Sequence, residues 1–337
     1  MSTQLLVSVV VIGRNEGPRL RRCLDSIRAM RLPAGSFEIV YVDSDSTDGS
    51  PAEAEAGGAR VCVVRPERPA AAIGRNAGWR TAAAPFVLFL DGDTVLDPDF
   101  VATSLPLFDD ATVAVVSGHR RELYPERSLY NRVLDLDWIG PAGEADFCGG
   151  DALIRRDALA AVDGYDETLI AGEEPDMCTR MRQLGWRILR LDCPMTGHDL
   201  AMTRWSQYWR RAVRTGHAYA EVSARYRASA TPLWQAEAHA NWVRAPILLA
   251  LPLTGLAGSL LLRSPLPALV VTGLLAVLAL RSARRFAWKS TDWLTLILYG
   301  VHSHLQQIPI YWGQLTYWRH RRAGRRQRLI EYKGDSA

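Results

Sequence analysis

Residues 86–93 have the sequence FVLFLDGD, in which five apolar residues are followed by two aspartates that a single glycine separates. A short apolar run of this kind, bounded by turn-forming residues, predicts a buried strand. Two carboxylates at the end of a strand can together bind Mg²⁺ or Mn²⁺, and such ions bridge phosphates. Asp and Gly also favour turns, so the triplet alone leaves an ordinary turn as the alternative.

Three more apolar runs precede this one, at residues 7–12, 38–42 and 61–64, with helical patterns between them. The alternation predicts an α/β fold, in which helices cover a mainly parallel sheet. Polar clusters follow the first, second and fourth runs, at residues 13–16, 43–46 and 91–93. Because ligands of open α/β sheets bind at the carboxyl ends of strands, we expect these clusters to face one crevice.

The two parts of the chain carry opposite charge. Residues 1–200 have a formal net charge of −10 and residues 201–337 one of +14, which nearly cancel to the +4 of the whole chain. A basic segment of this size indicates an anionic partner, either nucleic acid or a membrane surface. Residues 245–262 and 264–280 contain no charged residue, and eight of the 11 tryptophans follow residue 200. These features predict a membrane partner and no nucleic acid.

The arginines predict the topology of the membrane part. Basic clusters at residues 281–289 and 319–328 should stay in the cytoplasm, so two spans would return the chain to the side of its N-terminal domain. Residues 293–318 contain His302 and His304 in mid-segment, which is costly in hydrocarbon, and predict a helix lying on or dipping into the membrane. A third span remains the alternative. The first apolar run lacks the flanks of a signal peptide.

Four segments are therefore expected. Residues 1–200 form the α/β domain, and residues 201–243 form interfacial amphipathic helices, because aromatic and basic residues occupy separate helical faces near residues 203–220. Residues 244–281 form two transmembrane helices. Residues 282–337 form the interfacial or third membrane segment with a basic cytoplasmic tail.

Six short motifs of the first domain, taken together, resemble the motifs of a known protein family. The stretches are VSVVVIGRNEG (7–17), VDSDSTDGS (42–50), GRNAG (74–78), DGD (91–93), GGD (149–151) and GEEPD (172–176). Their order and spacing resemble family 2 inverting glycosyltransferases of the GT-A fold, a Rossmann-like fold of nucleotide-diphospho-sugar transferases. The resemblance covers about residues 5–220.

This resemblance implies a set of donor and metal contacts. Asp43 would accept a hydrogen bond from the nucleobase of the donor, and Asp91 would contact its ribose or the metal. The full donor-binding set is Val10, Ile12, Glu16, Asp43, Arg75, Asp91, Arg210 and Arg211. Asp93 would ligate Mg²⁺ or Mn²⁺ directly, with Asp91, and His198 would complete the metal site. For Arg75 the alternative is a helix-surface arginine, and for His198 a structural role.

The same resemblance assigns the catalytic base. Glu174 matches the position of the base, which would take a proton from the acceptor hydroxyl as that oxygen attacks the anomeric carbon. The family normally has Asp there, and the longer side chain leaves Asp176 as a second catalytic candidate. An acidic cluster that caps the helix at 175–184 is the structural alternative.

Two further motifs relate to the acceptor and the phosphates. Gly150 and Asp151 resemble the acceptor-side loop, where glycine allows close backbone approach. Arg210 and Arg211 fall in QYWRR (207–211), which resembles the Gln-x-x-Arg-Trp element of membrane-bound synthases with Arg in place of Trp. The pair could grip the donor diphosphate or the phosphates of a lipid carrier, or lie among lipid headgroups.

The sequence therefore predicts a membrane-anchored, metal-dependent, inverting hexosyltransferase. The resemblance implies a nucleotide-sugar donor, UDP-linked by expectation, and a lipid-linked acceptor such as a polyprenyl-diphosphate saccharide. The setting would be the cytoplasmic face of a bacterial inner membrane, in envelope or exopolysaccharide biosynthesis, with polysaccharide-assembly proteins as further partners. The alternatives are a glycolipid-forming transferase and a catalytically inactive nucleotide-sugar-binding subunit of a polysaccharide complex.

Overall fold

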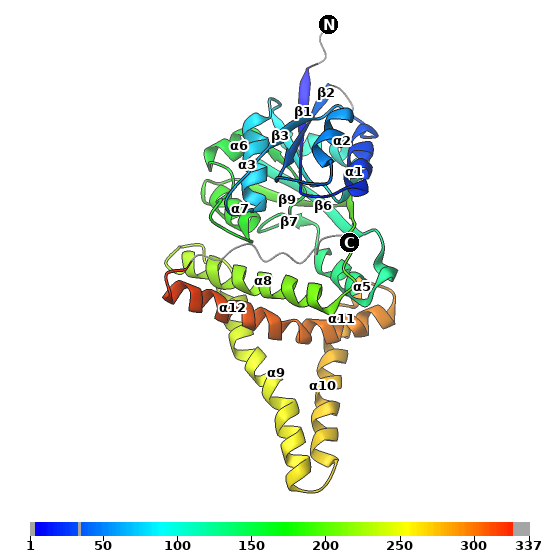
Figure 1. Ribbon diagram of the computed structural model, residues 1–337, viewed down its shortest axis with the longest axis vertical. Coiled ribbons are helices and arrows are strands. Elements are labelled where there is room, and N and C mark those ends of the chain that lie inside the picture. Colours follow the sequence, from blue (N-terminus) through cyan, green and yellow to red (C-terminus); the bar gives the residue numbers. More distant parts are fainter. Residues whose placement is uncertain (1–3, 33–34, 326–337) are drawn as a thin grey trace. The chain divides into compact units, whose positions relative to one another are not determined.

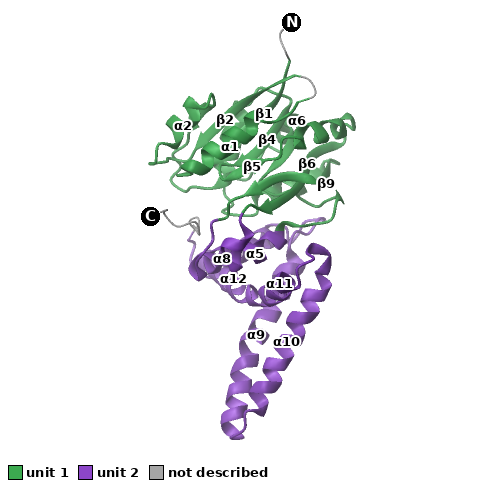
Figure 2. Cartoon of the chain, turned by 90° about the vertical axis from the view of Figure 1, so that its right-hand side faces the viewer, with its two compact units in different colours: residues 1–123, 138–200 green, residues 124–137, 201–337 purple. Residues whose placement is uncertain are grey.

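The computed structural model describes residues 4–32 and 35–325, and the end of the predicted basic tail lies outside the described residues. The chain divides into two compact units, coloured separately in Figure 2. Unit 1 comprises residues 1–123 and 138–200, and unit 2 comprises residues 124–137 and 201–337. Unit 1 ends at residue 200, and the predicted division into four segments stays a prediction. The assignment of residues 124–137 to the second unit was not predicted.

Unit 1 contains, within the described residues, one nine-stranded sheet (Figure 1). Its first part is parallel and consists, in spatial order, of β3 (Arg60–Val63), β2 (Ser36–Asp43), β1 (Leu5–Gly13) and β4 (Phe86–Asp91). All four predicted strands are therefore present. Because these strands are parallel, Gly13, Asp43 and Asp91 end at the same edge of the sheet.

The second part of the sheet is mixed. Beyond β4, the order continues with β8 (Ala152–Arg155), β6 (Val113–Glu122), β9 (Arg187–His198) and β5 (Thr94–Leu96), and β7 (Gly143–Glu144) pairs with β9. β8 is antiparallel to both β4 and β6, whereas β6 and β9 are parallel. This part departs from the mainly parallel sheet that was predicted.

Two apolar clusters cover the two faces of the sheet. One cluster joins alternate residues of β1 (Val7, Val9 and Val11) to α1 (Pro18–Arg28), α2 (Ser50–Ala56) and α4 (Phe100–Ser104). The other includes Val10 and packs against α3 (Ala71–Thr81), α6 (Arg156–Ala161) and α7 (Glu173–Gln183). Successive side chains of a strand point to opposite faces, so the continuous run of valines serves both clusters.

Unit 2 is helical in its described part. Its long helices are α8 (Trp205–Arg225), α9 (Gln235–Leu261), α10 (Leu266–Arg285), α11 (Trp293–Leu305) and α12 (Gln307–Arg322). The short turn η4 (Ala287–Lys289) lies between α10 and α11, and the earlier segment of the unit contains η2 (Pro125–Arg127) and α5 (Leu129–Asp135). α8 and α12 lie side by side because glycine removes the side chain at their contact: a Cβ at Gly216 would collide with the carbonyl of Ile310, and one at Gly313 with that of Val213.

Two helices of unit 2 are long and apolar enough to span a membrane: α9 and α10, which form a hairpin in Figure 1. Most of their apolar side chains are exposed, among them Leu253, Leu261 and Val277. The two uncharged runs predicted as spans therefore lie in two apolar helices of sufficient length, and their insertion in a membrane stays a prediction. The predicted single helix at 293–318 is instead two helices, because α11 ends at Leu305 and Pro309 lies in the first turn of α12, where a missing N–H is tolerated.

Candidate active site

The candidate site lies at the carboxyl ends of the parallel strands. Gly92 N–H donates to the carbonyl of Ile12 over 2.8 Å, and Ser44 N–H donates to that of Gly13 over 2.9 Å. These bonds hold the loops after β4 and β2 against the end of β1. Ile12 therefore lies at the open edge of the sheet, whereas Val10 is fully buried in the core.

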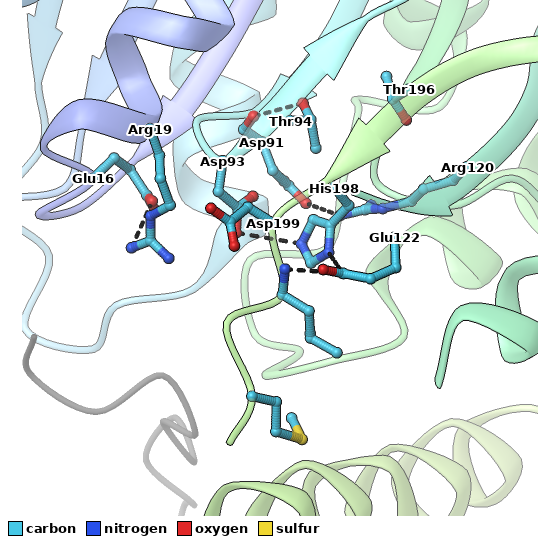
Figure 3. Close-up of polar contacts among 12 residues, drawn as sticks. Glu16, Arg19, Asp91, Asp93, Thr94, Arg120, Glu122, Thr196, His198 and Asp199 are labelled. Carbon is cyan, nitrogen blue, oxygen red and sulfur yellow. Dashed lines mark hydrogen bonds and ion pairs between the residues drawn. The ribbon is translucent and has the colours of Figure 1, made fainter. Parts of the chain in front are cut away.

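The loop after β2 is stabilised by the buried carboxylate of Asp43. Its oxygens accept hydrogen bonds from the Tyr41 hydroxyl at 3.0 Å, the Ser46 N–H at 2.7 Å and the Ser46 hydroxyl at 2.6 Å. Burial beside this carboxylate raises the pKa of Tyr41 above its usual range, so its hydroxyl stays a donor. On the neighbouring loop, Glu16 forms an ion pair with Arg19 at 3.0 Å (Figure 3).

Arg75 is the centre of a buried ionic cluster. Its side chain is 3% exposed, and Nη1 lies 3.0 Å from Oε1 of both Glu173 and Glu174, while Nη2 lies 3.0 Å from Oδ1 of Asp91. A charge removed from water requires such partners. The planar guanidinium can contact α7 and β4 at once because its N–H groups point in fixed directions. Arg75 is therefore not a surface arginine, and it joins the predicted base to the predicted donor site.

Asp91 also meets a second arginine. Its Oδ2 lies 3.3 Å from Nη2 of Arg120, on β6 (Figure 3). Nη1 of Arg120 lies 3.5 Å from the carboxylate of Asp151. In this structure Asp91 thus carries an arginine on each oxygen. This places two positive side chains beside the strand end at which a donor diphosphate is expected.

Glu174, the predicted base, is mostly buried and has a raised pKa. Its side chain is 15% exposed, and burial, with the neighbouring charge of Glu173, raises its pKa to about 7, although Arg75 opposes the shift. Asp176, its predicted rival, is held by Arg180 one turn along α7 at 2.8 Å, and Arg180 also donates to the carbonyl of Gly164. Both acids belong to the first turn of α7, where negative charge favours the helix dipole, but the N-cap residue, Gly172, forms no side-chain capping bond.

Gly150, the second of two glycines before β8, packs against this cluster. A Cβ at Gly150 would lie 2.5 Å from Nη2 of Arg75, 3.3 Å from Oδ2 of Asp91 and 3.4 Å from Oε1 of Glu174. Asp151 is fully buried and accepts hydrogen bonds from Asp91 N–H at 3.1 Å and from Thr196 at 2.7 Å. The structure therefore places Asp151 beneath Asp91, which differs from the acceptor contact predicted from the sequence.

Asp93 and His198 form the candidate metal pair. Nε2 of His198 lies 3.3 Å from Oδ2 of Asp93, both side chains are buried, and Nδ1 of His198 lies 3.8 Å from the carboxylate of Glu122 (Figure 3). The carboxylate suits Mn²⁺ or Mg²⁺, and an imidazole is a ligand of transition metals, so the pair fits Mn²⁺ better than Mg²⁺. Across residues 4–32 and 35–325, however, no group of three His, Cys, Asp or Glu side chains is arranged to hold a metal.

The remaining predicted donor contacts lie in unit 2, on α8. Arg210 donates to the carbonyl of Ser206 at 3.3 Å, and Arg211 lies 3.7 Å from Asp137. Their donor-binding role stays a prediction.

Sequence reasoning did not single out several residues of the site. Glu173, Arg120, Glu122 and Thr196 contact predicted site residues. Glu173 had a visible signal, since it directly precedes Glu174 in a helical first turn. The others come from distant strands, and no local pattern marks them.

Comparison with known proteins agrees with this fold. Residues 8–162 match glycosyl transferase family 2. Over 205 residues the chain is 28% identical to the pre-mycofactocin glycosyltransferase of Mycobacterium tuberculosis, covering 57% of this chain and 42% of that protein. It is also 24% identical, over 223 residues, to the beta-monoglucosyldiacylglycerol synthase of Nostoc, covering 60% of this chain and 47% of that enzyme.

A solved structure resembles most of the chain. The mannosyltransferase PcManGT from Pyrobaculum calidifontis, in complex with GDP-Man and Mn²⁺, superposes with a TM-score of 0.61, with 23% identity and coverage of 90% of this chain and 88% of that one. At this identity the likeness shows the fold.

The α/β part of the chain therefore has the GT-A fold. The chain is similar to glycosyl transferase family 2 over residues 8–162, which are less than half of its length. It spans less than half the length of the mycobacterial relative.

Proposed function

We propose that this protein is a membrane-anchored inverting glycosyltransferase, which transfers a sugar from a nucleotide-sugar to a lipid-linked acceptor. The observation that carries the proposal is the cluster of Arg75, Glu174 and Asp91. It combines a carboxylate whose pKa is about 7 with a buried cation at the edge where the parallel strands end.

In the proposed reaction Glu174 removes a proton from an acceptor hydroxyl. The oxygen attacks the anomeric carbon, the bond from that carbon to the diphosphate breaks, and the nucleoside diphosphate leaves with the bonding electrons. A single displacement of this kind inverts the anomeric centre. Arg75 positions Glu174 through the 3.0 Å contact, and Arg75 and Arg120 place positive charge near the leaving diphosphate.

A divalent ion is part of the proposal. Asp93 and His198 would hold Mg²⁺ or Mn²⁺, which supplies charge neutralisation for the departing diphosphate. PcManGT was solved with Mn²⁺ and GDP-Man, which supports a metal and a nucleotide-sugar donor. UDP is the first nucleotide to test as part of the donor, and GDP is the second.

Anchoring through α9 and α10 would hold the catalytic domain at the cytoplasmic face of a bacterial inner membrane. Arg281, Arg284 and Arg285 near the end of α10 favour retention of that end in the cytoplasm. Confinement to the surface raises the effective concentration of a lipid-linked acceptor. A polyprenyl-diphosphate saccharide of envelope or exopolysaccharide synthesis is the proposed acceptor, handed on to polysaccharide-assembly proteins.

A glycolipid product is the second candidate, and one observation favours it. The matched Nostoc relative is named as a synthase of monoglucosyldiacylglycerol. The chemistry at Glu174 would be unchanged, and only the acceptor would differ.

The test is transfer of labelled sugar from a panel of UDP-, GDP-, CDP- and dTDP-sugars to lipids of the host membrane. Products are extracted and analysed by mass spectrometry and, for the anomeric configuration, by NMR. A carrier-linked saccharide supports the first acceptor, and a diacylglycerol glycolipid supports the second. Glu174→Gln should abolish transfer, and Glu55→Gln, an exposed acid on α2, is the control. Full transfer by Glu174→Gln would contradict the assignment of the base.

A further inference from the structure

A cavity in unit 2 has a polar lining that the proposed transfer does not use. It has a volume of ≈ 360 Å³ and lies among the first turns of α9, the junction of α11 and α12, and α8. Its polar lining includes Glu237, Asn241, Arg244, Ser303, Gln306 and Gln307. The lining residues all belong to one compact unit.

Two amide side chains of the lining, Asn241 and Gln307, carry buried hydrogen-bond acceptors. Asn241 is 6% exposed, and its Nδ2 donates to the backbone carbonyl of Gln307 at 3.0 Å. Gln307 donates through Nε2 to the carbonyl of Ser303 at 2.9 Å. These bonds orient both amides, and the described residues provide no donor for Asn241 Oδ1 or Gln307 Oε1, although both atoms are buried. Buried acceptors of this kind favour a ligand that brings O–H or N–H groups.

The same cavity is also lined by a positively charged side chain, that of Arg244. Arg244 is exposed, and no carboxylate of the described ranges forms an ion pair with it. It is also the last charged residue before the uncharged run at 245–262. On a spanning α9, this position is the boundary between the polar turns and the hydrocarbon, where a long cationic side chain reaches the headgroup level.

We propose that this cavity binds the headgroup of a membrane phospholipid. The lipid phosphate contacts the Arg244 guanidinium, and O–H or N–H donors of the headgroup bond to Asn241 Oδ1 and Gln307 Oε1. Phosphatidylethanolamine and phosphatidylglycerol carry both a phosphate and such donors, whereas phosphatidylcholine carries the phosphate without them. The exposed carboxylate of Glu237, two helical turns before Arg244, complements an ammonium group. The inference rests on the proposed anchoring of α9 and α10 and is independent of the transfer reaction.

The experiment is native mass spectrometry of the detergent-purified full chain, titrated separately with each of these three lipids. Wild type should bind phosphatidylethanolamine or phosphatidylglycerol at least about tenfold more tightly than phosphatidylcholine. Arg244→Gln should lose about tenfold in affinity for the preferred lipid, as expected for one charge-assisted hydrogen bond. Arg227→Gln, an exposed arginine outside the cavity lining, is the matched control and should bind as wild type does. Gln307→Met, which removes one acceptor, should lose selectivity against phosphatidylcholine while retaining phosphate binding.

Three results would overturn the proposal. Equal binding of the three lipids, or unchanged binding by Arg244→Gln, would mean that the cavity does not recognise the lipid headgroup. Equal affinity for soluble glycerophosphoethanolamine and its lipid would identify a site for a soluble phosphate compound instead. Resistance of wild type to carbonate extraction from membranes tests the anchoring separately, and sugar transfer by the same variants tests the function separately.

Discussion

The glycine pair at 149–150 gives a sharp test of the ionic cluster. The alanine Cβ in Gly150→Ala would lie 2.5 Å from Nη2 of Arg75, about 1 Å closer than carbon and nitrogen approach in van der Waals contact. Arg75 cannot swing aside freely, because it is buried and bound at 3.0 Å to Glu174 and Asp91. A shift of about 1 Å breaks one charge-assisted hydrogen bond, worth about 1.5–3 kcal/mol. We therefore expect kcat/KM to fall about tenfold to hundredfold.

The assay is release of nucleoside diphosphate by purified protein, with thermal unfolding followed on the same samples. Gly149→Ala is the control, since a Cβ there meets no atom within 4 Å, and it should retain activity. In an Arg75→Met background, Gly150→Ala should cost little more, because its main obstacle is gone. Wild-type kcat/KM in Gly150→Ala would refute the reasoning, as would equal losses in the two alanine variants.

Three further predictions concern the base, the buried arginine and the helical unit. The pKa of Glu174 is raised to about 7, and a general base must be deprotonated to act. We therefore expect kcat/KM to fall about tenfold per pH unit below pH 7 and to level off above it. A flat profile from pH 5.5 to 8.5 would contradict this. Arg75→Lys should lower kcat/KM about a hundredfold and also reduce the melting temperature, because one ammonium group cannot bind carboxylates on both α7 and β4. Wild-type values in both measurements would show that the cluster does not matter for activity or stability. Gly313→Ala should destabilise unit 2 by about 1–3 kcal/mol in thermal unfolding, because its Cβ would collide with the Val213 carbonyl. Gly273→Ala is the control, since a Cβ at that position meets no atom within 4 Å. Equal melting temperatures of the two variants would show that α8 and α12 can separate freely.

The local features of the fold were readable from the sequence. Each of the four predicted strands is an apolar run bounded by turn residues, and the structure contains a strand at each. The two uncharged runs became α9 and α10. These predictions succeeded because strand and span signals are local, set by the period and length of apolar runs.

What the sequence could not supply were contacts between distant segments. Arg120 meets Asp91 because β6 joins the sheet through the antiparallel β8, and that order follows from packing. The burial of Asp151 has the same origin, since Thr196 closes over it from β9. Residues 124–137 belong to unit 2 although a local reading placed them within the first domain. The break between α11 and α12 did have a local signal, in Pro309.

The central claim is that the strand-end site binds a nucleoside diphosphate with a divalent ion. The most direct measurement is thermal stability of the detergent-purified protein with UDP, GDP, CDP or dTDP, each with and without Mn²⁺. The variants are Asp93→Asn and, as a control, Asp109→Asn, which changes an exposed acid of unit 1. At a ligand concentration of about 100 times Kd, one nucleotide should add about 2.7 kcal/mol to wild type and the control only with Mn²⁺, and nothing to Asp93→Asn. Stabilisation by no nucleotide, or an equal effect in Asp93→Asn, would contradict the account.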